Sequence, residues 1–541
     1  MSSAGEQLQS WKEIARYLRR SVRTARRWER VEGLPVHRHV HHSRASVFAM
    51  RSEIDAWRHS RAEAPRAAEA PEASAATTSI AVLPFQNLSA EAASEYFAAG
   101  LTEEITTTLS KVRALRVTSR TSALTLRGSP KTARAIAKLL RTRYLLQGSV
   151  RRFGPRLRIS AQLIDAMSDA HCWADTFEGE LADVFEMQEK LARLIVAALK
   201  LHLTARDERQ LTARGIGTVA AYELYLRARQ EGWRWRRDAI DRAVQLLGEA
   251  LRIEGDSAPL YAALGVAYLQ YREAGIDLSE RPLQEAERCA AQVLALEPGS
   301  SAALQLRGWI HYSRGRIQSA VRDLNAALAG EPHNADTLLL LCNCYIISGQ
   351  VAAARPLLQR LASVDPLTPI SVCMPAFADI MEGRFARALK PYRQMFGLDP
   401  ANPLARLFYV WVLILNRRHR QALALVRSCP ADLQDSLAGR VMRLLAAALT
   451  GELHGAPGRL PPAMAALAAA TDMFPRFLAQ GFALAGQRTA ALRWLRIAVA
   501  RGFINYPYLA RHDPCFKRLR PDVRFQRLLQ TTKRRWDSFV I

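Results

Sequence analysis

The chain of 541 residues has little of what an extracellular or membrane-spanning protein needs. Its seven cysteines are odd in number and irregularly spaced, which argues against a disulfide framework and for a reducing compartment. No run of 18 apolar residues occurs, and the longest candidate, Phe408 to Leu415, is better explained as a buried helix. The first residues include no apolar segment typical of a secretory signal. We therefore expect a cytoplasmic protein without a membrane span.

Catalytic signatures are also missing. The sequence has no P-loop, no HExxH zinc motif, no GxGxxG dinucleotide motif and no GxSxG nucleophile elbow. The adjacent acids Glu103 and Glu104 fall on the surface of a predicted helix, where a solvated position is the simpler interpretation. We expect a protein that is not an enzyme, with no catalytic residues, no cofactor and no bound metal.

Acidic residues are scarce relative to basic ones. The chain has 76 Lys and Arg against 50 Asp and Glu, a formal net charge of +26, and a pI near 10.4. Such an excess suits a polyanionic partner, nucleic acid first and an anionic membrane surface second. An arginine-rich proteome is the simpler explanation for part of it, because Arg outnumbers Lys along the whole chain. The position of the charge is therefore more informative than its sum.

A period of 34 residues runs through the second half of the chain. Prolines that each follow an acidic residue recur at this interval, at Pro298, Pro332, Pro366 and Pro400. Small residues keep the same interval, at Gly315, Gly349 and Gly383 and at Ala320, Ala354, Ala388 and Ala422. This pattern is that of the tetratricopeptide repeat, in which Gly permits the turn, Ala lets two helices pack closely and Pro ends the second helix. We expect an all-α superhelix over residues 218–505, whose groove binds a protein or peptide, and a basic cap over 506–541.

Residues 79–205 alternate between strand and helix patterns. We expect strands at Ile80–Phe85, Leu115–Ser119, Tyr144–Arg151, Arg156–Asp165 and Cys172–Phe177, and helices at Glu95–Val112, Thr132–Arg141 and Phe185–Leu203. The strings IAVLPFQNLS, YFAAGLTEEITTTLSKV and YLLQGSVRRFGPRLRISAQLIDA resemble the TolB-like N-terminal domain. That module often lies between an effector domain and helical repeats in bacterial regulators. The resemblance implies a role in transmitting or receiving a signal.

The first sixty residues carry a helix-turn-helix pattern. Ser10 and Glu13 form a capping box before one amphipathic helix. Ser21 can cap a second helix, whose inner face is Val22, Ala25 and Trp28. The outer face of this second helix carries Arg23, Thr24, Arg26, Arg27 and Arg30. Two short helices with Arg and Thr exposed on the second meet the requirement for entry into a DNA major groove.

A basic ribbon and a third helix follow. Strands are expected at Val36–Val40 and Ala45–Ala49, and a helix at Glu53–Trp57. The whole resembles the winged helix-turn-helix of the excisionase and MerR-like type over residues 8–60. Residues 1–61 hold thirteen Lys and Arg against six Asp and Glu. The expected DNA-binding residues are Ser21, Arg23, Thr24, Arg26, Arg27 and Arg30 in the second helix, and Arg38, His39 and Arg44 in the wing. Among these, Arg23 and Thr24 are expected to read base edges, and Arg38 and Arg44 to hold phosphate.

Some patterns leave two interpretations open. His37, His39 and His41 alternate on the wing, and their imidazoles either bind a metal or meet phosphate and water; the second is favoured because no Cys or acid completes a ligand set. Trp233 and Trp235 lie among arginines. They suit base stacking, or, more commonly, an aromatic repeat helix covered by arginine side chains.

Together these patterns predict a multidomain chain. It combines a small α winged helix-turn-helix head (1–61), a flexible Ala/Pro/Glu linker (62–78), an α/β TolB-like domain (79–205) and an all-α tetratricopeptide superhelix (218–505) with its cap (506–541). We expect a transcriptional regulator that binds double-stranded DNA, as a homodimer because half-sites come in pairs, and that receives a protein or peptide signal. The alternative is a repeat scaffold that assembles protein complexes.

Overall fold

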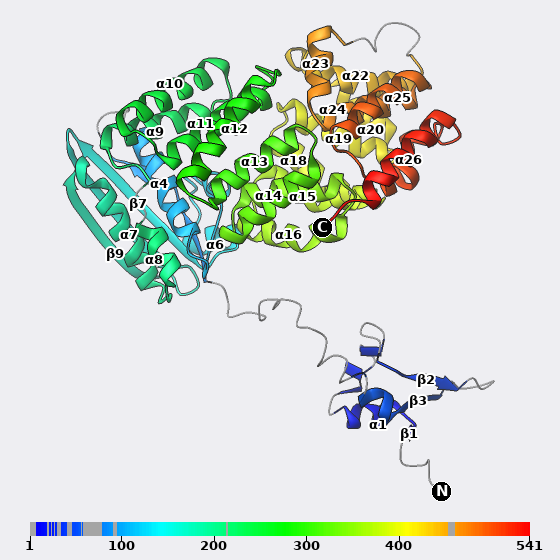
Figure 1. The fold of residues 1–541 in the computed structure, drawn as a ribbon, viewed down its shortest axis with the longest axis horizontal. Helices are drawn as coiled ribbons and strands as arrows, with labels where there is room; N and C mark the ends of the chain where they lie inside the picture. Colours follow the sequence, from blue (N-terminus) through cyan, green and yellow to red (C-terminus); the bar gives the residue numbers. More distant parts are fainter. Residues whose placement is uncertain are drawn as a thin grey trace. The chain divides into compact units, whose positions relative to one another are not determined.

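A computed structural model describes most of the chain: residues 7–18, 21–22, 24–25, 28–29, 34–39, 46–55, 57, 78–89, 95–212, 215–452 and 460–541. The chain divides into two compact units, residues 1–76 and 77–541 (Figure 1). Residues 62–77 of the predicted linker lie outside the described residues, and its last residue, Thr78, already belongs to a strand.

The first unit contains a three-stranded antiparallel sheet and short helices. The strands β1 (Gln7–Leu8), β2 (His37–His39) and β3 (Ser46–Met50) lie in the order β1-β3-β2. Helix α1 (Trp11–Tyr17) starts where the capping box predicts, because Ser10 Oγ accepts a hydrogen bond from the Glu13 amide at 3.3 Å. The reciprocal bond differs, since the Glu13 carboxylate accepts from the Gln9 amide at 2.8 Å.

The predicted inner face of the second helix packs on the core of this unit, with Ala25 buried and Val22 and Trp28 partly buried. The described residues between positions 22 and 29 are helical, and Ala25 is completely buried with Ile14, Leu34 and Ile54 around it. The third helix begins at Arg51, two residues before its predicted start. Strand β1 was not predicted, because two residues are too few to show an alternating pattern.

A mixed sheet begins the second unit. Its strand order is β6-β4-β7-β8-β9, with β5 paired to β7; the strands are β4 (Thr78–Val82), β5 (Gln86–Asn87), β6 (Leu115–Val117), β7 (Tyr144–Phe153), β8 (Arg156–Asp165) and β9 (Ala170–Glu180). Strand β4 is parallel to β6 and β7, whereas β7, β8 and β9 form an antiparallel meander. The predicted hairpin between β7 and β8 is confirmed, and Gly154 occupies its turn at φ +55°.

Helices cover both faces of this sheet where its strands are parallel. They are α4 (Glu95–Ser110), α5 (Arg120–Leu124), α6 (Ala133–Leu140), α7 (Val184–Ala198) and α8 (Ala205–Thr212). Helices α4 and α7 share one core with Leu146 and Ile159, whereas α6 packs over Ala81 and Leu145 on the opposite face. The predicted α/β arrangement is present. Helix α5 is an addition whose five residues, RTSAL, carry no periodic apolar signal.

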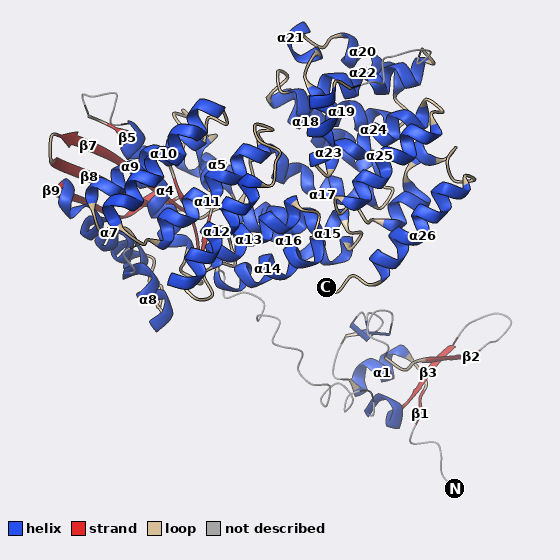
Figure 2. Cartoon of the chain, turned by 45° about the horizontal axis from the view of Figure 1, so that its top comes forward, coloured by secondary structure: helices blue, strands red, loops and turns tan. Residues whose placement is uncertain are grey.

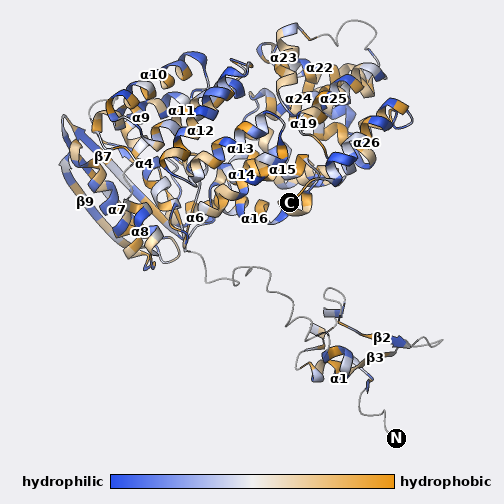
Figure 3. Cartoon of the chain, in the orientation of Figure 1, coloured by the Kyte–Doolittle hydropathy of each residue, from blue (hydrophilic) through white to orange (hydrophobic). Residues whose placement is uncertain are grey.

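The rest of the second unit is helical (Figure 2). The helices are α9 (Val219–Gly232), α10 (Arg237–Glu254), α11 (Ala258–Glu273), α12 (Arg281–Leu296), α13 (Ser301–Ser313), α14 (Ile317–Gly330), α15 (Ala335–Ile347), α16 (Val351–Val364), α17 (Pro369–Met381), α18 (Leu389–Leu398), α19 (Pro403–Leu415), α20 (His419–Arg427), α21 (Ala431–Gln434), α22 (Leu437–Thr450), α23 (Pro462–Ala470), α24 (Met473–Leu484), α25 (Arg488–Ala500) and α26 (Val523–Asp537). Hydrophobic and hydrophilic residues alternate around them, as amphipathic packing requires (Figure 3). No helix in the described part of the chain is both long and apolar enough to cross a membrane.

The predicted roles of the periodic Pro, Gly and Ala residues are confirmed at each position. Helices α12, α14, α16 and α18 each end two residues before the periodic proline. The periodic glycines all adopt positive φ, at +73° for Gly315, +81° for Gly349 and +79° for Gly383. The periodic alanines are at most 1% exposed: Ala320, Ala354, Ala388 and Ala422.

One turn of the array has the same positive φ without a glycine. Arg417 lies 34 residues after Gly383, and its φ is +58°. A side chain in the left-handed region brings Cβ close to the backbone, at a cost of roughly 1–2 kcal/mol. The repeat geometry therefore imposes a strained conformation on Arg417.

The C-terminal segment runs back along the array instead of only covering its end. The amide of Ile504 donates to the carbonyl of Ile347 at 3.1 Å, and the indole of Trp536 lies against Gly349. His512 lies against Gly383 in the same way. A Cβ at either glycine would come within 3.0 Å of these rings, so the close approach is a second reason for glycine.

We predict that Arg417→Gly stabilises the protein. The substitution relieves the strain of the left-handed backbone, but glycine also raises the conformational entropy of the unfolded chain, which offsets part of the gain. The free energy of unfolding should therefore rise by about 0.5–1 kcal/mol. Denaturant unfolding of the variant and the parent measures this. Arg417→Ala is the control, since it removes the same charge and keeps a Cβ; a similar gain in both variants would contradict the explanation by strain.

Candidate functional site

The start of the second helix in the first unit contains two of the predicted DNA-binding residues. Ser21 is exposed, and its Oγ accepts a hydrogen bond from the Thr24 amide at 3.2 Å, as predicted for a helix cap. The hydroxyls of Ser21 and Thr24 lie 2.9 Å apart. Both side chains therefore stabilise the helix start. Arg23, Arg26, Arg27, Arg30 and Arg44 lie outside the described residues, as does the side chain of His39.

Arg38 on β2 is tied to the second helix. Its Nη2 lies 2.5 Å from Oε1 of Glu29, while the arginine side chain remains 58% exposed. This ion pair joins the predicted wing to the second helix. The guanidinium that was expected to hold phosphate thus already has a carboxylate partner.

The neighbouring histidine also has an acidic partner. His37 Nε2 lies 2.6 Å from Glu53 Oε2, and its ring stacks on Phe48 with centroids 5.1 Å apart. His41 lies outside the described residues. Among the residues that are described, no group of three potential ligands is arranged to hold a metal ion.

In the second unit, the α/β part contacts the array first through α4 and α9, which lie side by side (Figure 1). Glu103 forms an ion pair with Arg229 and lies 3.5 Å from Arg120. Glu104 accepts a hydrogen bond from the Tyr225 hydroxyl at 3.0 Å, and burial raises the pKa of Glu104.

The expected solvated position of Glu103 and Glu104 is therefore wrong. Glu103 is only 8% exposed, because α9 covers the face of α4 that points away from the sheet. A local signal for the contact between α4 and α9 was available in Gly100. A Cβ there would come 2.5 Å from Leu226, so the glycine allows close packing of the two helices.

The second contact between the α/β part and the array is a set of hydroxyls around Asp365, which we call the Asp365 latch: Ser119, Ser122, Asp365, Thr368 and Ser371. Asp365 is 5% exposed. Its carboxylate accepts from Ser122 at 2.7 Å and Thr368 at 2.6 Å, and also from Ser119 and Ser371.

Backbone contacts support the latch. The Ser119 amide donates to the Val364 carbonyl at 2.6 Å, and the Leu367 amide donates to Ser122 Oγ at 2.9 Å. Arg116 also donates to the carbonyl of Ser363. The loop between β6 and α5 is thus fixed to the end of α16, more than 240 residues later in the chain.

A large cavity lies between the α/β part and the array. Its volume is about 1410 Å³, and its wall comes from α4, from the turn between α9 and α10, and from array helices as far as α24. That volume exceeds the 300–1,000 Å³ typical of small-molecule sites and leaves room for an extended chain. Aromatic rings recur in the wall: Tyr225, Trp233, Trp235, Trp309, Tyr312, Phe377, Tyr392, Phe408 and Trp411.

The predicted helical position of two of these rings is corrected. Trp233 is the C-cap of α9, and Trp235 lies in the turn that follows, at φ +53°. Both are nearly half exposed toward the cavity, at 48% and 44%. The guanidinium carbon of Arg120 lies 4.7 Å from the centroid of the Trp233 ring.

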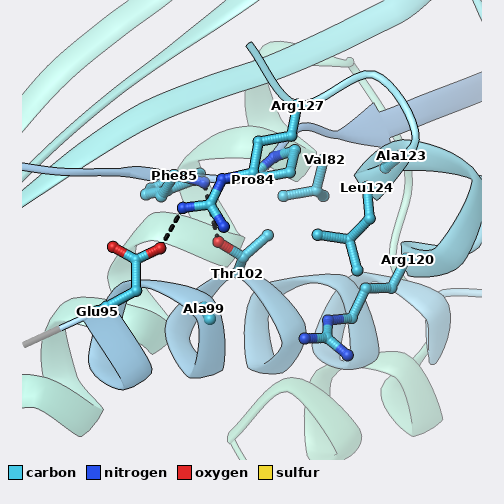
Figure 4. Close-up of a pocket in the computed structure, with 10 residues that line it drawn as sticks. All are labelled: Val82, Pro84, Phe85, Glu95, Ala99, Thr102, Arg120, Ala123, Leu124 and Arg127. Carbon is cyan, nitrogen blue, oxygen red and sulfur yellow. Dashed lines mark hydrogen bonds and ion pairs between the residues drawn. The ribbon is translucent and has the colours of Figure 1, made fainter. Parts of the chain in front are cut away.

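A second, much smaller pocket lies beyond the end of β4 (Figure 4). Arg127 reaches across it to Glu95, and the Phe85 amide donates to Thr102 Oγ1 at 3.0 Å. The carboxyl ends of parallel strands are the usual ligand site of α/β folds. This pocket has only about 20 Å³, room for about one water molecule, so it does not support a ligand site.

Comparison with known families identifies two parts of the chain. Residues 76–194 match the second domain of HilA/YgeH-like transcriptional regulators. Residues 311–370 and 379–448 match the tetratricopeptide repeat, as the 34-residue period predicts. The α/β part is thus a HilA/YgeH-like regulator domain, and the array contains tetratricopeptide repeats. The resemblances to a TolB-like domain and to an excisionase or MerR-like head stay predictions.

Solved structures with some similarity are tetratricopeptide repeat proteins. One from Parabacteroides merdae ATCC 43184 is 14% identical, covers 52% of this chain and all of its own length, and has a TM-score of 0.34. A thermophilic one from Thermus thermophilus is 17% identical, covers 36% of this chain and all of its own, and has a TM-score of 0.31. The assignment of the repeats rests on the family match and the punctuation above.

The expectation that the protein is not an enzyme is contradicted by a curated relative. "Putative adenylate cyclase 3" of Rhizobium meliloti (strain 1021) is 39% identical over 203 residues, which are 38% of this chain and 35% of the relative. This chain thus matches about a third of the relative's length. The error in our expectation lies in its basis, because four missing motifs exclude only the four chemistries that those motifs serve.

We predict that the Asp365 latch stabilises the second unit. Asp365→Asn replaces an acceptor of four hydroxyls with a group that is half donor, so buried hydroxyls lose their acceptor at a cost of about 1–3 kcal/mol. Denaturant unfolding measures the decrease in the free energy of unfolding. The rate of amide hydrogen exchange at residues 115–124 should increase in the variant.

Asp399→Asn is the matched control. Asp399 is the equivalent acid one repeat later, 34 residues on, and its side chain is exposed. It should change stability by less than about 0.5 kcal/mol. Equal losses in the two variants would mean that the repeat position, and not the latch, needs the acid.

Proposed function

We propose that this protein is a transcriptional regulator that binds double-stranded DNA through its first unit and receives a protein or peptide signal through the second. The observation that carries the proposal is the match of residues 76–194 to a HilA/YgeH-like regulator domain, directly after an arginine-rich unit. A cytoplasmic location and a homodimer on paired half-sites belong to the same proposal.

The first unit supports DNA binding by its charge and its local structure. Its second helix starts at the exposed Ser21 cap, and its wing strand β2 presents Arg38 to solvent. The proposed DNA-contacting residues are those given by the sequence: Ser21, Arg23, Thr24, Arg26, Arg27, Arg30, Arg38, His39 and Arg44. A helix N-terminus with basic side chains suits the phosphate backbone as well as base edges.

The second unit supports reception of a signal by its shape. The cavity is lined by both the regulator domain and the repeats, so an occupant would contact both. The Asp365 latch and the α4–α9 contact border that same space. Occupancy can therefore alter the contacts between the two parts, which is the property that a receiver needs.

A second candidate function is nucleotide cyclisation, favoured by the 39% identity to the protein named putative adenylate cyclase 3. Because the match spans 35% of that relative, we propose it as an activity to be measured on the purified chain. Incubation with ATP and Mg²⁺, followed by detection of cyclic AMP, tests it.

Chromatin immunoprecipitation with sequencing tests the first proposal. A regulator should give discrete peaks that share a sequence element, because base readout separates specific from nonspecific affinity by roughly 10³–10⁷. A chain lacking residues 1–61 should lose the peaks. Absence of peaks for the full chain would favour a scaffold that assembles protein complexes.

We predict that Glu29→Gln strengthens DNA binding. The substitution frees the Arg38 guanidinium from its 2.5 Å ion pair and removes a negative charge beside it. The affinity for duplex DNA should rise several-fold, and the slope of log K against log salt should steepen by about 0.9, the value for one added phosphate contact. Fluorescence anisotropy across a salt series measures both quantities.

Glu53→Gln serves as the control. It removes one negative charge from the same unit but releases His37 and, among the described residues, no arginine. Its salt slope should match that of the parent. If Glu53→Gln steepened the slope as much as Glu29→Gln, the gain would come from net charge and not from Arg38.

A further inference from the structure

The wall of the large cavity contains a buried arginine that has aromatic neighbours but no acid. Arg476 on α24 is 4% exposed and lines the cavity. Its guanidinium carbon lies 5.0–5.2 Å from the centroids of four rings: Phe377, Trp411, Phe477 and Phe503. We call this group the Arg476 cluster. Within the described ranges, no carboxylate lies within 4.0 Å of the guanidinium, and no residue accepts a hydrogen bond from it.

A second buried donor in the cluster also lacks an acceptor. The Nε1 of Trp411 has no hydrogen-bond partner among the described residues, and Nε of Arg476 has none either. Trp411 is 1% exposed and lines the same cavity. Buried N–H groups nearly always find an acceptor, and a buried charge is costly unless it is paired. The ring faces offset only part of this cost.

One carboxylate in the same region, that of Asp513, compensates the charge of Arg476 only weakly. Asp513 is completely buried and accepts from Gln480, which follows Arg476 by one helical turn, at 2.7 Å. It also accepts from the Cys515 amide at 2.9 Å. Burial raises the pKa of Asp513, although the charge of Arg476 acts in the opposite direction. The Asp513 oxygens are thus used by other donors and do not reach Arg476.

We propose that the Arg476 cluster is the binding site for a carboxylate group carried by an apolar ligand. A carboxylate supplies the acceptors that the guanidinium and the indole N–H lack, and its single negative charge matches the single positive charge. A phosphate dianion would leave excess negative charge at the Arg476 cluster, which contains a single arginine. The neighbouring wall is apolar, which suits the rest of the ligand: Ile370, Cys373, Met374, Tyr392, Phe408 and Met473.

The carboxylate has two sources with the same chemistry, the C-terminal end of a peptide and a free organic acid. The inference rests on the proposed role of the cavity in receiving a ligand, but it does not depend on DNA binding. The 1410 Å³ of the cavity admits either source.

The test is thermal unfolding of the full chain with paired probes. The probes are acetyl-Ala-Leu-Phe with a free carboxylate, 3-phenylpropionate, and the uncharged amide of each. At about 10 mM, at least one carboxylate should raise Tm in a saturable manner while its amide does not. The carboxylate that acts at the lower concentration identifies the source.

Variants connect the response to the cluster. Arg476→Met should weaken the carboxylate response at least about tenfold, and Trp411→Phe, which removes only the indole N–H, should weaken it several-fold. Arg501→Met is the control. Arg501 lines the same cavity, but its hydrogen bonds go to the carbonyls of Ala469 at 2.8 Å and Ser313 at 3.3 Å, so its response should equal that of the parent.

Three results would overturn the inference: no shift with either carboxylate, equal shifts with the amides, or a full response in both Arg476→Met and Trp411→Phe. If Arg476→Met does not fold, Trp411→Phe alone decides the last point. DNA binding measured on the same preparation separates the two proposals, since a chain that binds DNA but ignores carboxylates contradicts only this one.

Discussion

The buried carboxylate of Asp365 is the constraint on which the second unit depends. In the repeat itself, this residue only precedes the proline that follows α16. Here its carboxylate also accepts hydrogen bonds from hydroxyls of α5 and of the start of α17. These bonds fix the regulator domain to the middle of the array. A buried anion surrounded by donors is stable, whereas the same anion without them is costly. The contact is thus specific to one arrangement of the two parts.

This second attachment explains the cavity. The α4–α9 contact alone would leave the array free to extend away from the sheet. With the Asp365 latch in place, the regulator domain touches the array both at its first helix and at the end of α16, so the surface between these points lines a half-open cavity. Arg476 and Trp411 are nearly completely buried in the wall of this cavity, so the effective dielectric around them is low and an unpaired donor is more costly there than on the protein surface.

The sequence patterns predicted those features of the fold that depend on residues close together in the chain. The periodic Pro, Gly and Ala residues predicted the helix ends, the turns and the closest packing, because each acts within one repeat. The latch pairs residues 243 positions apart, and Tyr225 with Glu104 are 121 apart. No periodicity connects such positions, so Glu103 and Glu104 were predicted to be solvated. Arg38 shows the same limit, since its type predicts phosphate binding and only the fold places Glu29 beside it.

The positions of the arginines explain part of the chain's positive charge. Several arginines of the second unit donate to backbone carbonyls at helix ends, which are partly negative but add no formal charge: Arg116, Arg406, Arg501 and Arg535. An arginine used in this way raises the net charge without a nucleic acid partner. The sum of +26 therefore overstates the polyanion-binding surface. The charge that bears on the proposed DNA binding is the excess within the first sixty residues, where Arg38 is exposed and has one carboxylate partner among the described residues.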